Sequence, residues 1–162
     1  MENKKKIETI PIILLTLLLS IVAVLSMLIS MKIYTNAQNK VTENRLNRIG
    51  VNYILTKLKC NDKENGITIG KFNDIDAIFL NEDIEGCIYT TVLYVYDGYL
   101  RELFCEEDLV DSFAIQSGDT ITPADSLKVF LNGRNLEILF TGVTKKEQKI
   151  SYYIKSGEYR YD

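Results

Sequence analysis

The chain has 162 residues, with 19 Lys and Arg against 22 Asp and Glu, a net charge of -3, and neither His nor Trp. Without a basic excess, the composition argues against nucleic acid as a partner, and without His it excludes Ser–His–Asp and Cys–His catalytic arrangements. The sequence also contains no phosphate-binding glycine loop and no recognisable catalytic set of side chains. We therefore predict no enzymatic activity, no cofactor and no metal site.

The first element in chain order is an apolar run over residues 10–31 that contains no charged side chain. A helix of that length spans about 33 Å and can cross a hydrocarbon core of about 30 Å. The apolar region of a secretory signal is usually shorter, about 7–15 residues, so we expect a retained anchor. The alternative is a signal that is cleaved near Ala37.

Positive charge flanks this run on both sides, and the short charged tail that precedes it favours an N-terminus in the cytoplasm. We predict a cytoplasmic tail over residues 1–9, a transmembrane helix over 10–34 and an extracytoplasmic remainder. The protein is thus expected to be a single-pass protein of the cell membrane, with the membrane as its first partner.

Small and weakly polar residues share one side of this helix. At 3.6 residues per turn they fall on one arc or directly beside it: Thr16, Ser20, Ala23, Ser26 and Ser30. Because small residues let membrane helices approach closely, this arc is a candidate packing face for another membrane helix. The alternative is that the hydroxyls bond only to their own helix backbone.

An amphipathic helix is predicted over residues 35–60. Its apolar face is marked by Val41, Leu46, Ile49, Tyr53 and Leu58. No Pro separates it from the apolar run, so the two segments are expected to form one long helix. Gly50 is a weak point, and the turn residues 61–66 are expected to end the helix.

Residues 61–162 predict an antiparallel sheet of about six to seven strands packed on this helix, an α+β fold. The clearest element is a hairpin whose two-residue turn is Asp97-Gly98, because type I′ turns require positive φ at both central residues. Strands are predicted over residues 67–72, 77–80, 87–96, 99–105, 126–131, 136–141 and 148–155, with polar loops at 74–76, 81–83 and 132–135.

Three cysteines, Cys60, Cys87 and Cys105, are candidates for a disulfide in an extracytoplasmic domain. A two-residue turn at Asp97-Gly98 places Cys105 opposite Thr90, and Cys87 then points to the other face of the sheet. A Cys87–Cys105 bond is therefore disfavoured and three free thiols are expected, while a bond from Cys60 to either remains an alternative. The acidic runs at 81–85 and 106–111 are interpreted as solvated turns, with calcium binding as the alternative.

Aromatic and basic residues gather around the first hairpin. Tyr89, Tyr94, Tyr96, Tyr99 and Arg101 form a candidate interaction surface, since Tyr and Arg are enriched at interfaces. The same tyrosines are also ordinary strand formers, and we favour sheet packing as their main role.

The sequence of residues 94–104, Tyr-Val-Tyr-Asp-Gly-Tyr-Leu-Arg-Glu-Leu-Phe, resembles the signature of an uncharacterised domain family of Gram-positive bacteria. Residues 52–58 resemble the juxtamembrane helix of that family. Its members look like minor pilin-like proteins, including competence pseudopilins, in which a long N-terminal helix is capped by an antiparallel sheet. Glu8 supplies an acidic side chain near the membrane edge, but no Gly precedes Lys4, so prepilin-type processing is not expected.

Together these observations predict a membrane-anchored, pilin-like component of an envelope assembly. The resemblance implies other membrane or pilin-like proteins as partners. The alternative is a membrane-tethered binding module that uses the Tyr-rich hairpin. The oligomeric state is left open by the sequence.

Overall fold

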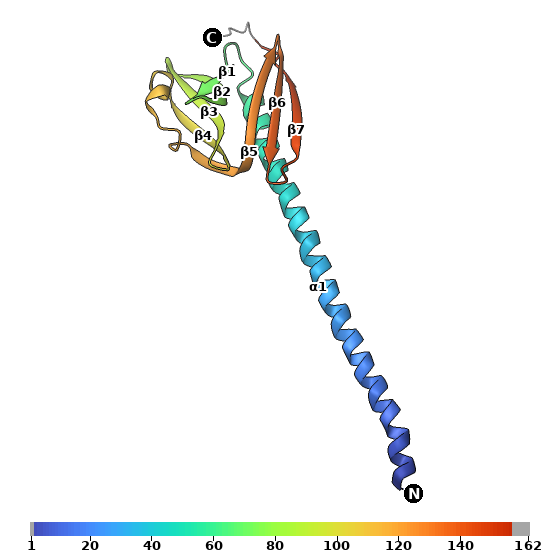
Figure 1. Ribbon diagram of the computed structural model, residues 1–162. Helices are drawn as coiled ribbons and strands as arrows, with labels where there is room; N and C mark the ends of the chain where they lie inside the picture. The colour runs from blue at the N-terminus through green and yellow to red at the C-terminus, as the bar shows by residue number, and fades with distance from the viewer. Residues whose placement is uncertain (1, 157–162) are drawn as a thin grey trace. The chain divides into compact units, whose positions relative to one another are not determined.

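The computed structural model describes residues 2–156, with side chains described for residues 11–39 and 41–156. This part of the chain forms the helix α1 (Glu2–Cys60) followed by seven strands and one 3-10 helix, the predicted α+β arrangement (Figure 1). The strands are β1 (Ile67–Phe72), β2 (Ile75–Ile84), β3 (Cys87–Tyr96), β4 (Tyr99–Glu106), β5 (Asp119–Asn132), β6 (Asn135–Gly142) and β7 (Glu147–Tyr153). The 3-10 helix η1 (Glu107–Ser112) follows β4.

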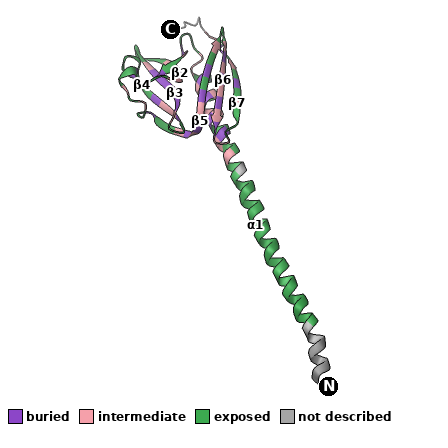
Figure 2. Cartoon of the chain, in the orientation of Figure 1, coloured by how far each residue is buried: buried purple, intermediate pink, exposed green. Residues whose placement is uncertain are grey.

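The chain divides into two compact units, and the boundary lies inside α1 between Thr42 and Glu43. In the first unit all described side chains are exposed, as the green part of α1 in Figure 2 shows. Its apolar segment has a mean hydropathy of 3.0, and within the described residues α1 is the one helix long and apolar enough to cross a membrane. The side chains of residues 2–10, including Glu8, lie outside the described part.

In the second unit the strands follow one another in the sheet in chain order, and every neighbouring pair is antiparallel. Asp97 and Gly98 join β3 to β4 in a two-residue turn, with φ of 52° and 75°. Thr90 pairs with Cys105 in this hairpin. All three cysteines are free as expected, with Cys60 and Cys87 exposed and Cys105 buried.

Three predicted loops are wrong in extent. Residues 81–83 belong to β2, which turns at Glu85 and Gly86, and residues 75–76 already begin β2 after a turn at Asn73 and Asp74. The β5–β6 loop has two residues, because Asn132 pairs with Asn135. Polar side chains can occupy a strand wherever they face solvent, so the residues with positive φ, rather than polarity, fix where each turn falls.

The sheet has a core on each face. The larger core lies between the sheet and the C-terminal part of α1, and it contains Ile54 and Leu58 of the helix with buried residues from all seven strands. The smaller core lies on the opposite face of β1–β4, where Phe72, Val92 and Tyr94 are covered by Val110 of η1 and the segment that follows it. Two register shifts lie close together in β5, at Ile121 in its pairing with β4 and at Asp125 in its pairing with β6, and such irregularities bend a sheet.

Close packing of α1 on β6 depends on two glycines. A Cβ atom on Gly50 would lie 2.6 Å from Cζ of Phe140, and a Cβ atom on Gly142 would collide with the amide of Asn47. That amide is buried and donates a hydrogen bond to Thr144 in the β6–β7 loop. Gly50 therefore lowers helix propensity but allows the helix to approach the sheet.

We expect Gly50→Val to lower the free energy of unfolding by about 1–3 kcal/mol, because the added side chain overpacks the contact with Phe140. The matched control is Asn52→Val, which places the same β-branched residue at an exposed helix position. Thermal unfolding of the full chain in a mild detergent, followed by circular dichroism, measures both. Equal melting temperatures for the two variants would refute the close-contact role of Gly50, whereas partial recovery with Phe140→Leu would support it.

Candidate functional site

The hydroxyls on the predicted packing face of the apolar segment bond to the backbone of α1 itself. Thr16 donates to the carbonyl of Ile13 at 2.9 Å, and Ser20, Ser26 and Ser30 donate to carbonyls one turn earlier at 2.8 Å. These four side chains and Ala23 are exposed. The face therefore offers small volume, with its hydroxyls already satisfied, which suits close backbone approach better than hydrogen bonding across helices.

Tyr94 is wrongly placed in the predicted interaction surface, because its side chain is 0% exposed. Its ring packs against Phe72 with the centroids 4.9 Å apart. Its hydroxyl donates to the carbonyl of Ile115 at 2.8 Å and accepts from the N–H of Gly118 at 3.1 Å. Burial raises the pKa of this hydroxyl, so Tyr94 serves as a buried anchor for the segment that covers the smaller core.

Arg101 anchors the same segment from β4. Its guanidinium donates to the carbonyls of Gln116 and Gly118 at 3.1 and 3.0 Å and to that of Tyr96 at 3.4 Å, and it lies 5.8 Å from the centre of the Tyr96 ring. These contacts engage the Nε and Nη1 donors of the guanidinium within the chain itself. Tyr99, with 42% of its surface exposed, remains available on this face.

Tyr89 lies on the opposite face of β3, where it stacks on Phe104 with the ring centroids 5.4 Å apart. Because Tyr89 and Tyr99 point to different faces, the structure does not bring the five hairpin residues together into one surface. The alternation of side chains along the two strands that flank Asp97-Gly98 predicts this split, because residues opposite each other share a face and adjacent residues of one strand do not.

A carboxylate that the sequence analysis missed joins α1 to β4. Glu102 accepts hydrogen bonds from the Tyr53 hydroxyl and from Lys57, whose Nζ is 2.7 Å away. Burial and the bond to Glu102 raise the pKa of Tyr53. The signal was present in the alternation of β4, where Glu102 stands between Leu100 and Phe104 on the face that meets the amphipathic helix.

Asp62 forms a second polar link, between the turn after α1 and the end of β7. Its carboxylate accepts hydrogen bonds from the N–H groups of Lys155 and Ser156, each at 3.1 Å, and from the Tyr152 hydroxyl at 2.9 Å. Burial alone would raise the pKa of Asp62, but these hydrogen bonds outweigh it and the pKa is lowered. The link is structural, because all its donors come from the chain itself.

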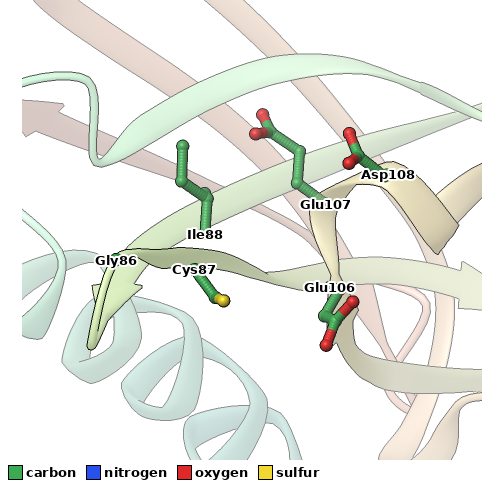
Figure 3. Close-up of a pocket in the computed structure, with 6 residues that line it drawn as sticks. All are labelled: Gly86, Cys87, Ile88, Glu106, Glu107 and Asp108. Atoms are coloured by element: carbon green, nitrogen blue, oxygen red, sulfur yellow. The ribbon is translucent and has the colours of Figure 1, made fainter.

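One surface depression, of about 310 Å³, lies where β3 begins and β4 ends (Figure 3). Its lining includes Cys87, Ile88, Glu106 and Glu107, but Cys87 and Glu106 point away from Ile88 and Glu107, so no set of polar groups converges. Among the described residues, no group of three or more Cys, Asp or Glu side chains is placed to hold a metal ion. The acidic runs therefore gain no support as a calcium site.

A larger groove, of about 500 Å³, lies between β1–β3 and η1. Its lining combines the Phe79 ring, the polar side chains of Asn81 and Thr90, and the carboxylates Glu107 and Asp111. Unlike the first depression, it gathers apolar, hydrogen-bonding and charged groups around one space, which is the usual composition of a binding site. The sequence analysis missed it, because η1 was interpreted only as part of an acidic turn.

These features define an α+β domain whose N-terminal helix carries an apolar segment long enough to span a membrane. The chain belongs to the family described as a domain of unknown function, DUF4860, whose model matches residues 46–142. The match extends from the packed part of α1 to the end of β6 and leaves the apolar segment outside. No curated protein and no solved structure matches the chain.

We expect Asp62→Asn to lower the free energy of unfolding by about 1–3 kcal/mol at neutral pH, because a charged acceptor of several hydrogen bonds is lost. Since the folded-state pKa is lowered, this contribution is present above the unfolded value of about 4 and is lost as the pH falls through the lower folded value. The measurement is thermal unfolding of both chains from neutral to strongly acidic pH. Asp125→Asn, at an exposed position of β5, is the control. A gap between the wild type and Asp62→Asn that stays constant with pH would contradict the assignment.

Proposed function

We propose that this protein is a single-pass membrane protein and that its α+β head acts as a pilin-like, minor structural or interaction component of an envelope assembly. In this proposal the N-terminus is cytoplasmic and the head is extracytoplasmic. The partners are the membrane and other membrane or pilin-like proteins, and no catalysis, cofactor or nucleic acid is involved.

The observation that supports this proposal is the continuity of α1. One uninterrupted helix contains an apolar segment whose described side chains are all exposed and a later segment whose apolar residues enter the core of the head. Exposed apolar surface on that scale is stable only in lipid or against other apolar surfaces. A helix that is shared between a membrane and a sheet domain can pass between lipid and a bundle of similar helices without refolding the head.

The alternative binding module on the Tyr-rich hairpin is less well supported. Tyr94 is buried and Arg101 is engaged with the segment that covers it. Of the other rings, Tyr96 and Tyr99 share a face, but the Arg101 guanidinium lies over the Tyr96 ring, and Tyr89 lies on the opposite face. A binding function of the head therefore has to use another part of its surface.

The predicted orientation can be tested with the native cysteines. We expect a membrane-impermeant maleimide to label Cys60 and Cys87 in intact bacterial cells, because both are exposed, and to label Cys105 only after unfolding, because it is buried. As a control, Lys5→Cys in a Cys60→Ser/Cys87→Ser background should react only after lysis. Labelling of Cys60 and Cys87 only after lysis would place the head in the cytoplasm and reject the proposal.

Assembly through the helix can be tested by oxidative crosslinking in native membranes. In a Cys60→Ser/Cys87→Ser background, Ala23→Cys should form crosslinked products several-fold more efficiently than Leu25→Cys, which lies on the opposite side of the helix. Mass spectrometry of the products identifies whether the partner is a second copy or another protein. Recovery of monomer alone, or equal crosslinking from both faces, would count against a role in an assembly.

A further inference from the structure

The groove beside β1 is bounded on one side by an outer strand of the sheet. β1 is the first strand in the sheet order and pairs only with β2 among the described strands. Residues of β1 from Thr68 to Lys71 line the groove, and Gly70 and Lys71 are exposed. The wall opposite β1 is η1, through Glu107, Val110 and Asp111. The groove therefore runs alongside an unpaired sheet edge.

The register shows which main-chain groups this edge presents. The N–H of Asn81 donates to the carbonyl of Gly66 at 2.9 Å, so these two residues form a hydrogen-bonded pair. In an antiparallel ladder such pairs alternate, and Thr68 and Gly70 of β1 therefore bond toward β2. The N–H and C=O groups of Ile67, Ile69 and Lys71 point the other way, outward, in the spacing that an added strand requires.

The floor of the groove is opened by a missing side chain. Gly70 stands over Phe79, and a Cβ atom at position 70 would lie 3.3 Å from Cε2 of the Phe79 ring. Beyond the ring, the Thr90 hydroxyl donates to the Asn81 side-chain oxygen at 2.9 Å, so these two polar side chains are bonded to each other. An apolar stem can thus lie on the ring while the polar group at its end lies near the η1 wall.

The charges at the rim of the groove indicate whether a positively or a negatively charged ligand group would bind there. Glu107 and Asp111 are exposed carboxylates on the η1 wall, whereas Lys71 is the single basic residue among those that line the groove. A long side chain with an apolar stem and a cationic head, Lys or Arg, complements both the ring and the carboxylates.

We propose that β1 binds an extended peptide segment of a partner protein, which adds to the sheet as a further antiparallel or parallel strand and places a Lys or Arg side chain in this groove. Main-chain hydrogen bonds to the outer edge of β1 supply affinity, and the groove supplies specificity for a basic side chain. The proposal concerns the head alone and holds whether or not α1 assembles with other helices.

The probe is a fluorescein-labelled peptide, Thr-Val-Lys-Val-Lys-Val-Thr, whose lysines share one face of a strand. Fluorescence anisotropy measures its binding to the full chain in nanodiscs of neutral lipid. We expect the peptide to bind and the analogue with Glu in place of Lys to bind at least about tenfold more weakly. Two further analogues of this peptide carry N-methyl groups, one on its odd-numbered and the other on its even-numbered residues. Only one edge of the added strand meets β1, so we expect one analogue to bind and the other to lose binding.

Protein variants locate the binding site. Glu107→Gln/Asp111→Asn should weaken binding of the Lys peptide about tenfold and reduce its dependence on salt. The control Glu64→Gln/Asp125→Asn removes the same charge from exposed positions outside the groove and should leave binding unchanged. Gly70→Val fills the groove and should also weaken binding, with thermal unfolding used to confirm that the variant is folded.

Three results would overturn the proposal. The first is no binding to the full chain, or equal binding of the Lys and Glu peptides. The second is equal binding of the two N-methylated analogues, which would show that the peptide binds through side chains alone and not as an added strand. The third is binding only to a chain that ends at Ser156, which would assign the edge to residues 157–162 of the same chain rather than to a partner.

Discussion

The head depends on one constraint, that a single helix must cover one face of a seven-stranded sheet. The larger core takes Ile54 and Leu58 from α1 and at least one buried residue from every strand. A flat sheet of this width would leave its outer strands beyond the reach of one helix, so the register shifts around β5 bend the sheet toward α1. The bent sheet contacts α1 only if the helix lies close to it. This close approach explains why glycine occupies position 50, opposite Phe140, and position 142, opposite Asn47. Thr122 also lies beside Gly50, and its buried hydroxyl has no hydrogen-bond partner within the part of the chain that the structure describes.

The way in which the second face of the sheet is covered follows from the position of α1 on the first face. Once α1 is committed to one side, the apolar residues on the other side of β1–β4 need a separate cover, and η1 with the segment after it provides one. That segment contains no long helix or strand, so it is fixed by side chains instead, through the Tyr94 hydroxyl and the Arg101 guanidinium. The cover reaches Phe72 at the end of β1 but not Gly70, which is exposed, and the groove beside η1 is the part of this face that remains open. The candidate binding site is therefore a consequence of covering a broad sheet with a short segment.

The sequence predicts the local elements better than it predicts their neighbours in space. Alternation and the Asp-Gly turn are sufficient for β3 and β4, whose pairing depends on residues close in the chain. The same local logic fails for Asn81 and Asp83, because polar residues are compatible with a strand when the side chain has a partner such as Thr90. The sequence favours sheet packing for the hairpin tyrosines, and Tyr94 is indeed buried, but nothing in its own strand shows that residues 115–118 will cover it. Glu102 and Asp62 were missed for the same reason, since each finds its partners at least 40 positions away, in Tyr53 and in the segment after β7 respectively.

The family match begins inside the packed part of α1 and ends with β6, so it is the head that identifies the chain as a member of DUF4860. The role of the apolar segment and the role of the head can therefore be considered separately, although one continuous helix joins the two parts. The apolar segment has its hydroxyls bonded to its own backbone, so its contribution is hydrophobic surface and small volume, which can place the chain in a membrane but cannot select a chemical ligand. Selectivity has to come from the head, where side chains of opposite character meet around one space. Since the hairpin tyrosines are divided between two faces, the groove along β1 is the place where the head combines an open main-chain edge with charge. In the proposed function, the apolar segment therefore sets the location of the chain and the head selects its partner.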